Sequence, residues 1–289
     1  MDTTKIADSD TLLHSVVRIK AGDANDPKFV HSGTGFFYVF ECNEGHIPAI
    51  ISNRHVLCDK SWLQFHVAEK DNNHNRILGA PIRVTGRSDQ FAIIGHPDPD
   101  VDLAAASFSG FPEALEQNGK SIHATFLSKK LFPPENMIRE LRTGINVSMI
   151  GFPVGLMDEV NNLPVARRGA LATPYFANYM GRSDFVADIA AFPGSSGSPV
   201  FATFDNIRPD GRGGVAFGPG RISYFLGILH SGPVMAADGE IIQAPVPTNY
   251  AISRTSIMIH LGYCVKSHRI DEFLPEILKR LDAERPSGV

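Results

Sequence analysis

Short apolar or alternating segments dominate the chain, and residues that favour turns separate them. Runs of about four to eight residues that are rich in Val, Ile, Phe or Tyr and bounded by Gly, Pro, Asn or Asp are typical of β-strands. Such runs predict strands at residues 15–20, 34–40, 46–52, 62–68, 80–86, 91–96 and 101–108, and again at 146–152, 165–172, 184–192, 198–204, 222–230 and 249–254. The segment ECNEGH, residues 41–46, predicts a tight turn and therefore a hairpin.

Two segments have a helical pattern instead. Within the polar, Pro-containing stretch from residue 110 to 142, the sequence ENMIRELR predicts a short helix. Near the end of the chain, apolar residues recur at helical spacing, at Ile270, Phe273, Leu274, Ile277, Leu278 and Leu281. We therefore expect an amphipathic C-terminal helix that packs back on the body. Two groups of strands joined by one longer linker predict two β-barrels or sandwiches.

The composition narrows the classes of partner. The 289 residues are 43% hydrophobic and 20% charged, with a formal net charge of −4. No stretch approaches the ~18 consecutive apolar residues that a membrane span needs. The slightly acidic balance and the scattered Lys and Arg residues do not favour binding to a nucleic-acid backbone. We therefore expect neither a membrane nor a nucleic acid as partner.

The amino-terminal segment and the cysteines predict a cytoplasmic protein. MDTTKIADSD lacks the basic start and the apolar region of a secretory signal. Cys42, Cys58 and Cys264 are odd in number and form no CxxC pair, as expected for reduced thiols. We interpret Cys58 as a small buried apolar residue. His66 and the NNHN stretch lack metal-ligand spacing, so we interpret them as surface and loop positions, and we predict no metal and no cofactor.

Three segments together point to one chemistry. ISNRHVL places His55 just after an apolar strand, DVDLAAASF places Asp102 just before another, and PGSSGSPVF holds three serines between glycines and prolines. A serine hydroxyl becomes a nucleophile when an imidazole accepts its proton and a carboxylate fixes the tautomer of that imidazole. Glycines allow the tight turn in which two backbone N–H groups converge on an oxyanion. The order His, Asp, Ser also argues against an α/β-hydrolase, which needs Ser before Asp before His.

From about residue 16 to residue 253 the chain resembles a trypsin-like serine protease of the chymotrypsin fold. It is similar to the bacterial trypsin-like, HtrA-like and glutamyl-endopeptidase-like branches. GTGFFY resembles the opening strand of the family, ISNRHVL its T-N-x-H-V segment, DLAAA its D-L-A segment and GFPVG its G-x-P-x-G turn. VADIAAFPGSSGSPVF resembles the segment that carries the nucleophile. No PDZ-sized module is expected after the protease region.

The resemblance implies a mainly β fold of two six-stranded antiparallel β-barrels, followed here by the predicted C-terminal α-helix. We assign residues 1–112 to an N-terminal barrel that carries His55 and Asp102, and residues 113–143 to an inter-barrel linker. Residues 144–265 form a C-terminal barrel that carries Ser196, and residues 266–289 the helix and tail.

The resemblance also implies the roles of the site residues. The third position of the G-x-S-G-G/S-P motif is the nucleophile, so this role falls on Ser196 rather than on Ser195 or Ser198. The backbone N–H groups of Gly194 and Ser196 form the oxyanion hole, and His55 is the general base and acid. Asp102 orients His55. Asp98 and Asp100 are rivals by proximity, but only Asp102 heads a strand.

The resemblance leaves the substrate preference open. Its implied pocket includes Ala190, His230, Ser231 and Gly232. Ala190 takes the place of the acidic residue of trypsin, so a Lys or Arg preference is not supported. His230 lies one residue from the position of a pocket histidine that favours Glu or Gln, and the alternative is a small or apolar residue at P1, the residue before the cleaved bond. Residues 208–221 predict a mobile loop near the cleft.

The function predicted is a serine endopeptidase that works through an acyl-enzyme on a protein or peptide substrate. A regulatory protein partner is also expected, because a cytosolic protease needs restraint. Two alternatives are an inactive protease-fold binding module and an esterase-like hydrolase that uses the same triad.

Overall fold

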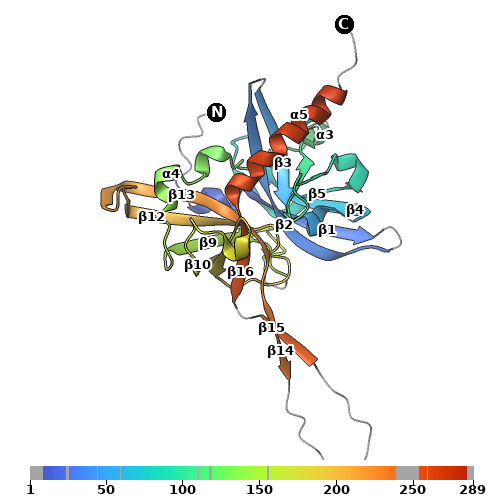
Figure 1. Ribbon diagram of the computed structural model, residues 1–289. Helices are drawn as coiled ribbons and strands as arrows, with labels where there is room; N and C mark the ends of the chain where they lie inside the picture. Colours follow the sequence, from blue (N-terminus) through green and yellow to red (C-terminus); the bar gives the residue numbers. More distant parts are fainter. Residues whose placement is uncertain are drawn as a thin grey trace, which may run out of the picture.

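Two antiparallel β-sheets make up the body, and a C-terminal helix crosses from one to the other (Figure 1). The computed structural model describes residues 9–23, 26–43, 45–58, 60–109, 111–116, 119–154, 156–238, 254–258 and 260–284. The short helices are α1 (Ser9–Leu13), α2 (Arg54–Leu57), α3 (Phe111–Glu116) and α4 (Glu135–Ile138). The last element is α5 (Phe273–Glu284), which a 3-10 turn, η5 (Ser267–Glu272), precedes.

The first sheet has eight strands and is open. They are β1 (Val16–Asp23), β2 (Asp26–Cys42), β3 (Gly45–Ser52), β4 (Trp62–Lys70), β5 (Arg76–Arg87), β6 (Ile94–Gly95), β7 (Ala104–Ser107) and β8 (Ile122–His123). Their order is β5-β4-β1-β2-β3-β7-β6, with β8 beside β4. Successive side chains of a strand point to opposite faces. On β2 this sends Phe36 and Tyr38 to the core between the sheets and Phe37 to the core of the first sheet.

The second sheet closes on itself. Its six strands are β9 (Asn146–Gly151), β10 (Val165–Leu171), β11 (Asp184–Asp188), β12 (Pro199–Pro209), β13 (Val215–Ser231) and β16 (Leu261–Lys266). They pair in the ring β10-β11-β16-β13-β12-β9. Phe185, Val200 and Leu226 fill its interior. A separate pair, β14 (Val234–Asp238) and β15 (Arg254–Met258), projects away from the body (Figure 1).

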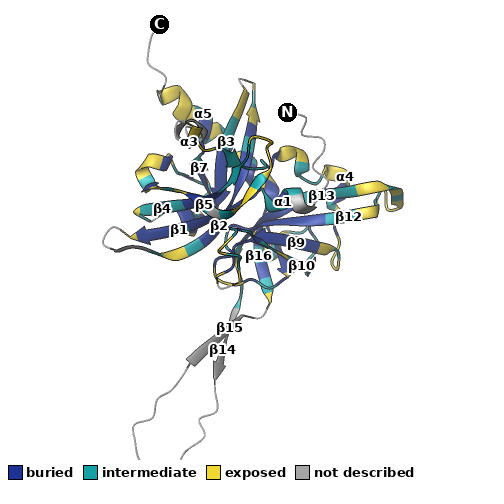
Figure 2. Cartoon of the chain, turned by 180° about the vertical axis from the view of Figure 1, so that it is seen from behind, coloured by how far each residue is buried: buried dark blue, intermediate teal, exposed yellow. Residues whose placement is uncertain are grey.

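A third apolar core is shared by both sheets and the C-terminal helix. Phe36 and Ile51 of the first sheet, Phe201 and Phe225 of the second, and Phe273 of α5 all belong to it. The Phe36 and Phe225 rings meet edge to face, with centroids 5.3 Å apart. In Figure 2 the strands at the centre are accordingly mostly dark blue, while the C-terminal end of α5 is yellow.

The predicted fold class is confirmed, and so is the amphipathic C-terminal helix. One difference concerns the first sheet, which has eight strands in an open order rather than six in a barrel. The expected strand at 91–96 is another, because a 3-10 turn (Ser88–Phe91) takes its first residue and leaves the two-residue β6. The expected strand at 249–254 lies outside the described residues apart from Arg254. The domain boundaries stay a prediction.

Residues 208–221 are a hairpin and not the predicted loop. β12 and β13 stay paired as far as Pro209 and Val215. The turn between them is held by Asp210, whose carboxylate accepts the N–H groups of Arg212 and Gly214 at 2.8 and 2.9 Å. The glycines in this stretch suggested a long loop, but they serve a short turn that one carboxylate closes.

Candidate active site

His55 lies on the short helix that follows β3. β3 ends at Ser52 and α2 begins at Arg54, so His55 stands at the junction of the two elements. The residue before α2, Asn53, does not cap the helix with its side chain. Its Nδ2 instead donates to the backbone carbonyl of Asp102 at 2.8 Å. This bond ties the start of α2 to the segment before β7.

Asp102 makes two contacts with His55. Its Oδ2 lies 2.6 Å from Nδ1 of the imidazole, and its Oδ1 accepts the backbone N–H of His55 at 3.1 Å. With Nδ1 donating to the carboxylate, the other ring nitrogen, Nε2, keeps its lone pair and can accept a proton. The rival Asp98 is engaged elsewhere, because its Oδ2 accepts Nη2 of Arg269 at 2.8 Å. Of the three aspartates that the sequence offers, Asp102 is thus the one that contacts His55.

The three serines of PGSSGSPVF differ in exposure. Ser195 and Ser198 are buried, and neither hydroxyl has a hydrogen-bond partner among the described residues. Ser196 is partly exposed. Gly194 and Gly197, on either side of it, both have φ near +87°, in the left-handed region that favours glycine. At Gly197 a Cβ would lie 1.9 Å from the carbonyl oxygen of Thr34, so a side chain is excluded there.

The backbone around Ser196 offers two N–H groups as hydrogen-bond donors. Neither the N–H of Gly194 nor that of Ser196 has a backbone acceptor among the described residues. The carbonyl of Pro193 accepts the N–H of Val154 at 2.9 Å. Because C=O and N–H of a trans peptide point in opposite directions, this bond turns the N–H of Gly194 away from Val154. Two unpaired donors of this kind can bind an anionic oxygen.

Thr34 joins the histidine half to the serine half, and sequence reasoning missed it. Its hydroxyl donates to the carbonyl of Gly194 and accepts the N–H of Phe152, both at 2.9 Å. Its N–H donates to the carbonyl of Ser196 at 2.8 Å, and its own carbonyl accepts the hydroxyl of Ser52 at 2.6 Å. Ser52 ends the strand that precedes His55. The only signal in the sequence was its position inside GTGFFY.

Ala190 lies next to a guanidinium group. Nη1 of Arg167, on β10, donates to the carbonyl of Ala190, and the guanidinium carbon lies 4.5 Å from the centre of the Phe192 ring. Burial lowers the pKa of Arg167 from its usual value. This contact could not be predicted, because nothing in VARRGALA distinguishes the arginine that donates to the carbonyl of Ala190 from its neighbour.

His230 faces an aspartate of the barrel wall. Its Nε2 lies 3.5 Å from Oδ2 of Asp184, at ion-pair distance but without hydrogen-bond geometry, and its Nδ1 lies 2.9 Å from the hydroxyl of Ser231. Gly232 approaches the serine segment closely, since a Cβ there would lie 3.3 Å from Cβ of Ala191. The structure therefore brings Gly232 to the segment that contains Ala190, while the His230 ring is engaged with Asp184.

The family model of the trypsin-like peptidase domain matches residues 33–206, which is more than half of the chain. The chain belongs to this family. The matched range contains His55, Asp102 and Ser196, and membership supports a peptidase function. The resemblance stated from the sequence motifs is thereby confirmed at the level of the family.

Two solved structures are similar to this peptidase at low identity. One is the crystal structure of the Rv3671c protease in an inactive form, with 15% identity and a TM-score of 0.43 over 92% of this chain and 89% of that one. The other is a serine-to-alanine mutant of Rv3671c from M. tuberculosis H37Rv, also inactive, with 16% identity and a TM-score of 0.40 over 95% and 89%. No curated protein sequence matches the chain.

The predictions made for His66 and for Cys58 need correction. His66 is buried at 4% exposure rather than on the surface, and its Nε2 lies 2.6 Å from Oε1 of Gln64. Burial, and then the positive charge of Arg18, lower its pKa to about 4. Cys58 is only half-buried, against the core of the first sheet. Within the described residues, no cluster of side chains suited to a metal ion occurs.

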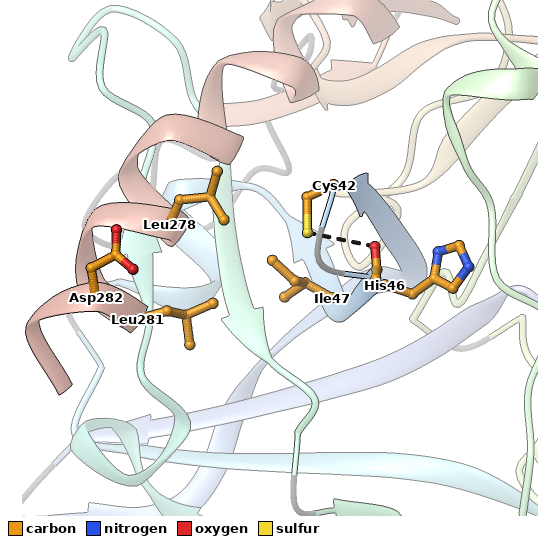
Figure 3. A pocket seen from close by; sticks show the side chains of 7 residues that line it. Cys42, His46, Ile47, Leu278, Leu281 and Asp282 are labelled. Carbon is orange, nitrogen blue, oxygen red and sulfur yellow. Dashed lines mark hydrogen bonds between the residues drawn. The ribbon is translucent and has the colours of Figure 1, made fainter. Parts of the chain in front are cut away.

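A pocket of about 260 Å³ lies between α5 and the β2–β3 hairpin (Figure 3). Ile47, Leu278 and Leu281 supply its apolar side, and the Cys42 thiol at its rim donates to the carbonyl of Gly45 at 3.5 Å. The lining includes none of the predicted site residues. In the described part of the chain, no helix is both long and apolar enough to cross a membrane.

Proposed function

We propose that this peptidase is a serine endopeptidase in which His55, Asp102 and Ser196 act as a triad. The hydroxyl of Ser196 attacks the scissile carbonyl while its proton passes to Nε2 of His55. The same proton then goes to the leaving amine, which leaves an acyl ester on Ser196. Water, deprotonated by His55, hydrolyses that ester and restores the serine. Every proton transfer uses a side chain of this protein, so the scheme needs no cofactor.

The observation that carries the proposal is the 2.6 Å contact between Nδ1 of His55 and Oδ2 of Asp102. The carboxylate holds the ring in the tautomer that a base for Ser196 requires, and it stabilises the imidazolium that forms in the reaction. The partial exposure of Ser196, against the burial of Ser195 and Ser198, also favours it as the nucleophile.

The N–H groups of Gly194 and Ser196 are the proposed oxyanion hole. Preorganised donors of this kind stabilise the charge that develops on the carbonyl oxygen, and the loss of one such donor costs about 10²–10³ in kcat. The bond from Val154 to the Pro193 carbonyl supports this role, because it keeps that carbonyl away from the oxyanion.

For the substrate, we propose a protein or peptide with a small or apolar residue at P1. The close approach of Gly232 to Ala191 leaves little room between the two segments for a long side chain. The carboxylate of Asp184 beside His230 opposes an acidic P1 side chain at that histidine. A cytoplasmic location is also proposed, because Cys42, Cys58 and Cys264 are reduced thiols, and with it a regulatory protein partner.

One experiment tests the nucleophile, the reaction and the preference together. The purified protein is labelled with a fluorophosphonate probe and profiled on a peptide library, in parallel with Ser196→Ala. We expect labelling and cleavage after Ala, Val or Leu, and a loss on the order of 10⁴–10⁶ in kcat for Ser196→Ala. Ser195→Ala and Ser198→Ala are matched controls. Since each removes a buried hydroxyl that has no partner in the described part of the chain, both should still be labelled.

The other outcomes separate the alternatives. A wild-type protein that binds peptides without being labelled would be a binding module. Labelling with hydrolysis of esters but not of amides would indicate an esterase. Cleavage confined to sites after Glu or Gln would contradict the P1 proposal and indicate that His230 lines the substrate pocket. Unchanged hydrolysis by Ser196→Ala would refute the triad.

A further inference from the structure

The segment between β9 and β10 contacts the proposed oxyanion hole at one end. At that end Val154 holds the carbonyl of Pro193, and Phe152 donates to Thr34, which in turn holds the carbonyl of Gly194. The packing is close, because a Cβ on Gly194 would lie 2.6 Å from the carbonyl oxygen of Phe152. The orientation of the Pro193–Gly194 peptide therefore depends on where this segment lies.

The other end of the segment, residues 158–163, folds on itself. The carboxylate of Asp158 accepts the N–H groups of Val160 and Asn161, both at 3.0 Å, and the side-chain amide of Asn161 at 2.7 Å. Leu163 closes the turn by donating its N–H to the carbonyl of Asp158 at 3.2 Å. These bonds make residues 158–163 a defined unit, which we call the clasp.

Among the described residues, the side-chain hydrogen bonds and ion pairs that attach the clasp to the rest of the protein all go to the first sheet. Nη2 of Arg76, at the start of β5, donates to the carbonyl of Asn162 at 2.6 Å and to that of Asn161 at 3.3 Å. The side chain of Asn162 donates to the carbonyl of His66 on β4 at 3.2 Å. Glu159 forms an ion pair with Arg18 on β1 at 3.1 Å. Three neighbouring strands of the first sheet thus hold one turn of the second barrel.

Two features mark the Arg76 contact as the strongest of these attachments. Asn162 is buried at 5% exposure and adopts a left-handed backbone with φ near +52°, which asparagine tolerates better than most residues. A guanidinium that donates to two carbonyls forms charge-assisted bonds, which are stronger than neutral ones. Glu159, by contrast, is 71% exposed, so water competes for its carboxylate although Arg18 is buried, and the ion pair contributes less.

We infer that Arg76 and the clasp are a positioning device for the oxyanion hole, a role that rests on the proposed serine-peptidase mechanism. Only residues 155–157 separate Val154 from the clasp, and Met157 among them packs against the core shared by the two sheets. When Arg76 is lost, the clasp loses these two bonds, and Val154 loses the restraint that reaches it through residues 155–157. The Pro193–Gly194 peptide can then rotate, so that a carbonyl instead of an N–H faces the oxyanion. Arg76 acts through Val154 and does not touch the substrate.

The test compares Arg76→Ala with Arg83→Ala in the full chain. Arg83 lies on the same strand and is exposed, and its side chain has no hydrogen bond or ion pair among the described residues. We expect Arg76→Ala to lower kcat on the order of 10- to 100-fold, with KM within about twofold, because the lost interaction acts in the transition state. Arg83→Ala should match wild type.

Two further measurements exclude a merely structural role. A peptide aldehyde, whose adduct with Ser196 places an oxygen in the oxyanion hole, should bind Arg76→Ala more weakly by the same factor as kcat/KM falls. The affinity for an uncleaved peptide, measured in the Ser196→Ala background, should not change. If Arg76→Ala does not fold, Asn162→Gly keeps the left-handed backbone, removes the bond to His66 and should show the same pattern to a smaller extent.

The outcomes keep this inference apart from the proposed function. A wild-type protein that neither cleaves peptides nor reacts with the fluorophosphonate probe contradicts the function itself, and the positioning role falls with it. An active wild type with unchanged kcat in Arg76→Ala and in Asn162→Gly refutes the positioning role alone. Equal losses of kcat and of peptide affinity would also refute it, because they indicate a general distortion.

Discussion

At the scale of single residues, Thr34 forms hydrogen bonds with four residues around the candidate site. Its hydroxyl donates to the carbonyl of Gly194 and accepts the N–H of Phe152. Its backbone N–H and C=O form hydrogen bonds with Ser196 and Ser52. The side chain is fully buried, so water cannot replace it if it is removed. A buried hydroxyl that satisfies two backbone groups is costly to lose.

Replacing Thr34 with valine should therefore damage both stability and catalysis. Thr34→Val keeps the shape but leaves two buried backbone groups without partners, so we expect the free energy of unfolding to fall by about 2 kcal/mol or more. kcat should fall as well, because Gly194 loses a restraint. Urea denaturation and steady-state kinetics measure the two effects. Thr34→Ser keeps the oxygen and is the control, and equal losses in both variants would contradict the role given to the hydroxyl.

His66 predicts a pH dependence of stability. Burial lowers its pKa from 6.5 to about 4 in the folded protein, so the folded state prefers the neutral ring. Below pH 6.5 the His66 ring is protonated in the unfolded chain but stays neutral in the folded protein. The free energy of unfolding therefore falls as the pH drops from 6.5 to about 4. From pH 7 to pH 5 this amounts to about 2 kcal/mol.

The check is chemical denaturation of wild type and His66→Gln at both pH values. The variant should lose less stability on acidification than wild type, by about that amount. His74→Gln is the control, because His74 is exposed in the turn before β5. Parallel losses in wild type and His66→Gln would rule out His66 as the titrating group.

At the scale of elements, the sequence predicted those whose residues alternate or repeat with one period. The C-terminal helix was predictable because Ile270, Phe273 and Ile277 recur at helical spacing, and all three are buried. The strand GTGFFYVF was predictable as a strand. Its long aromatic run could not reveal that its two faces serve two different cores, because that depends on where the second barrel lies.

Other elements depended on single polar groups that a pattern does not display. The hairpin between β12 and β13 is closed by the carboxylate of Asp210, and nothing in a Gly-rich stretch distinguishes such a turn from a loop. The same holds for the candidate site. Motifs pointed to His55, Asp102 and Ser196 in advance, whereas Thr34, Arg76 and Arg167 act through backbone carbonyls, which leave no mark on residue type.

At the scale of the whole molecule, the shared core binds the two halves into one unit. Phe273 of α5 is fully buried in that core, and its ring lies 5.1 Å from the ring of His96, near the start of the segment that leads to Asp102. Further along α5, Arg280 donates to the carbonyl of Ile93 at 3.2 Å. The helix follows the second barrel in sequence and packs against the first sheet.

Removing the Phe273 ring should weaken both halves together. Phe273→Ala leaves a cavity in the shared core, so we expect a loss of about 3–5 kcal/mol in the free energy of unfolding. Trp62, the single tryptophan, reports on the first sheet, and circular dichroism reports on the whole chain. Both signals should move to lower denaturant concentration and still coincide. Leu281→Ala, at a position 40% exposed on the same helix, should cost much less. Separated transitions would contradict a single cooperative unit.

The first sheet is open and the second is closed, so the two should differ in how readily this peptidase digests its own chain. A strand at the end of a sheet can peel away and offer an extended chain to the cleft of another copy, whereas strands within a ring have no such end. Helix α5 lies over β6, one end of the first sheet, and β5 is the other end. Within the two large sheets, self-digestion on storage should therefore begin near β5 or the turn before it, in the half that carries His55, and spare the closed ring of the second sheet.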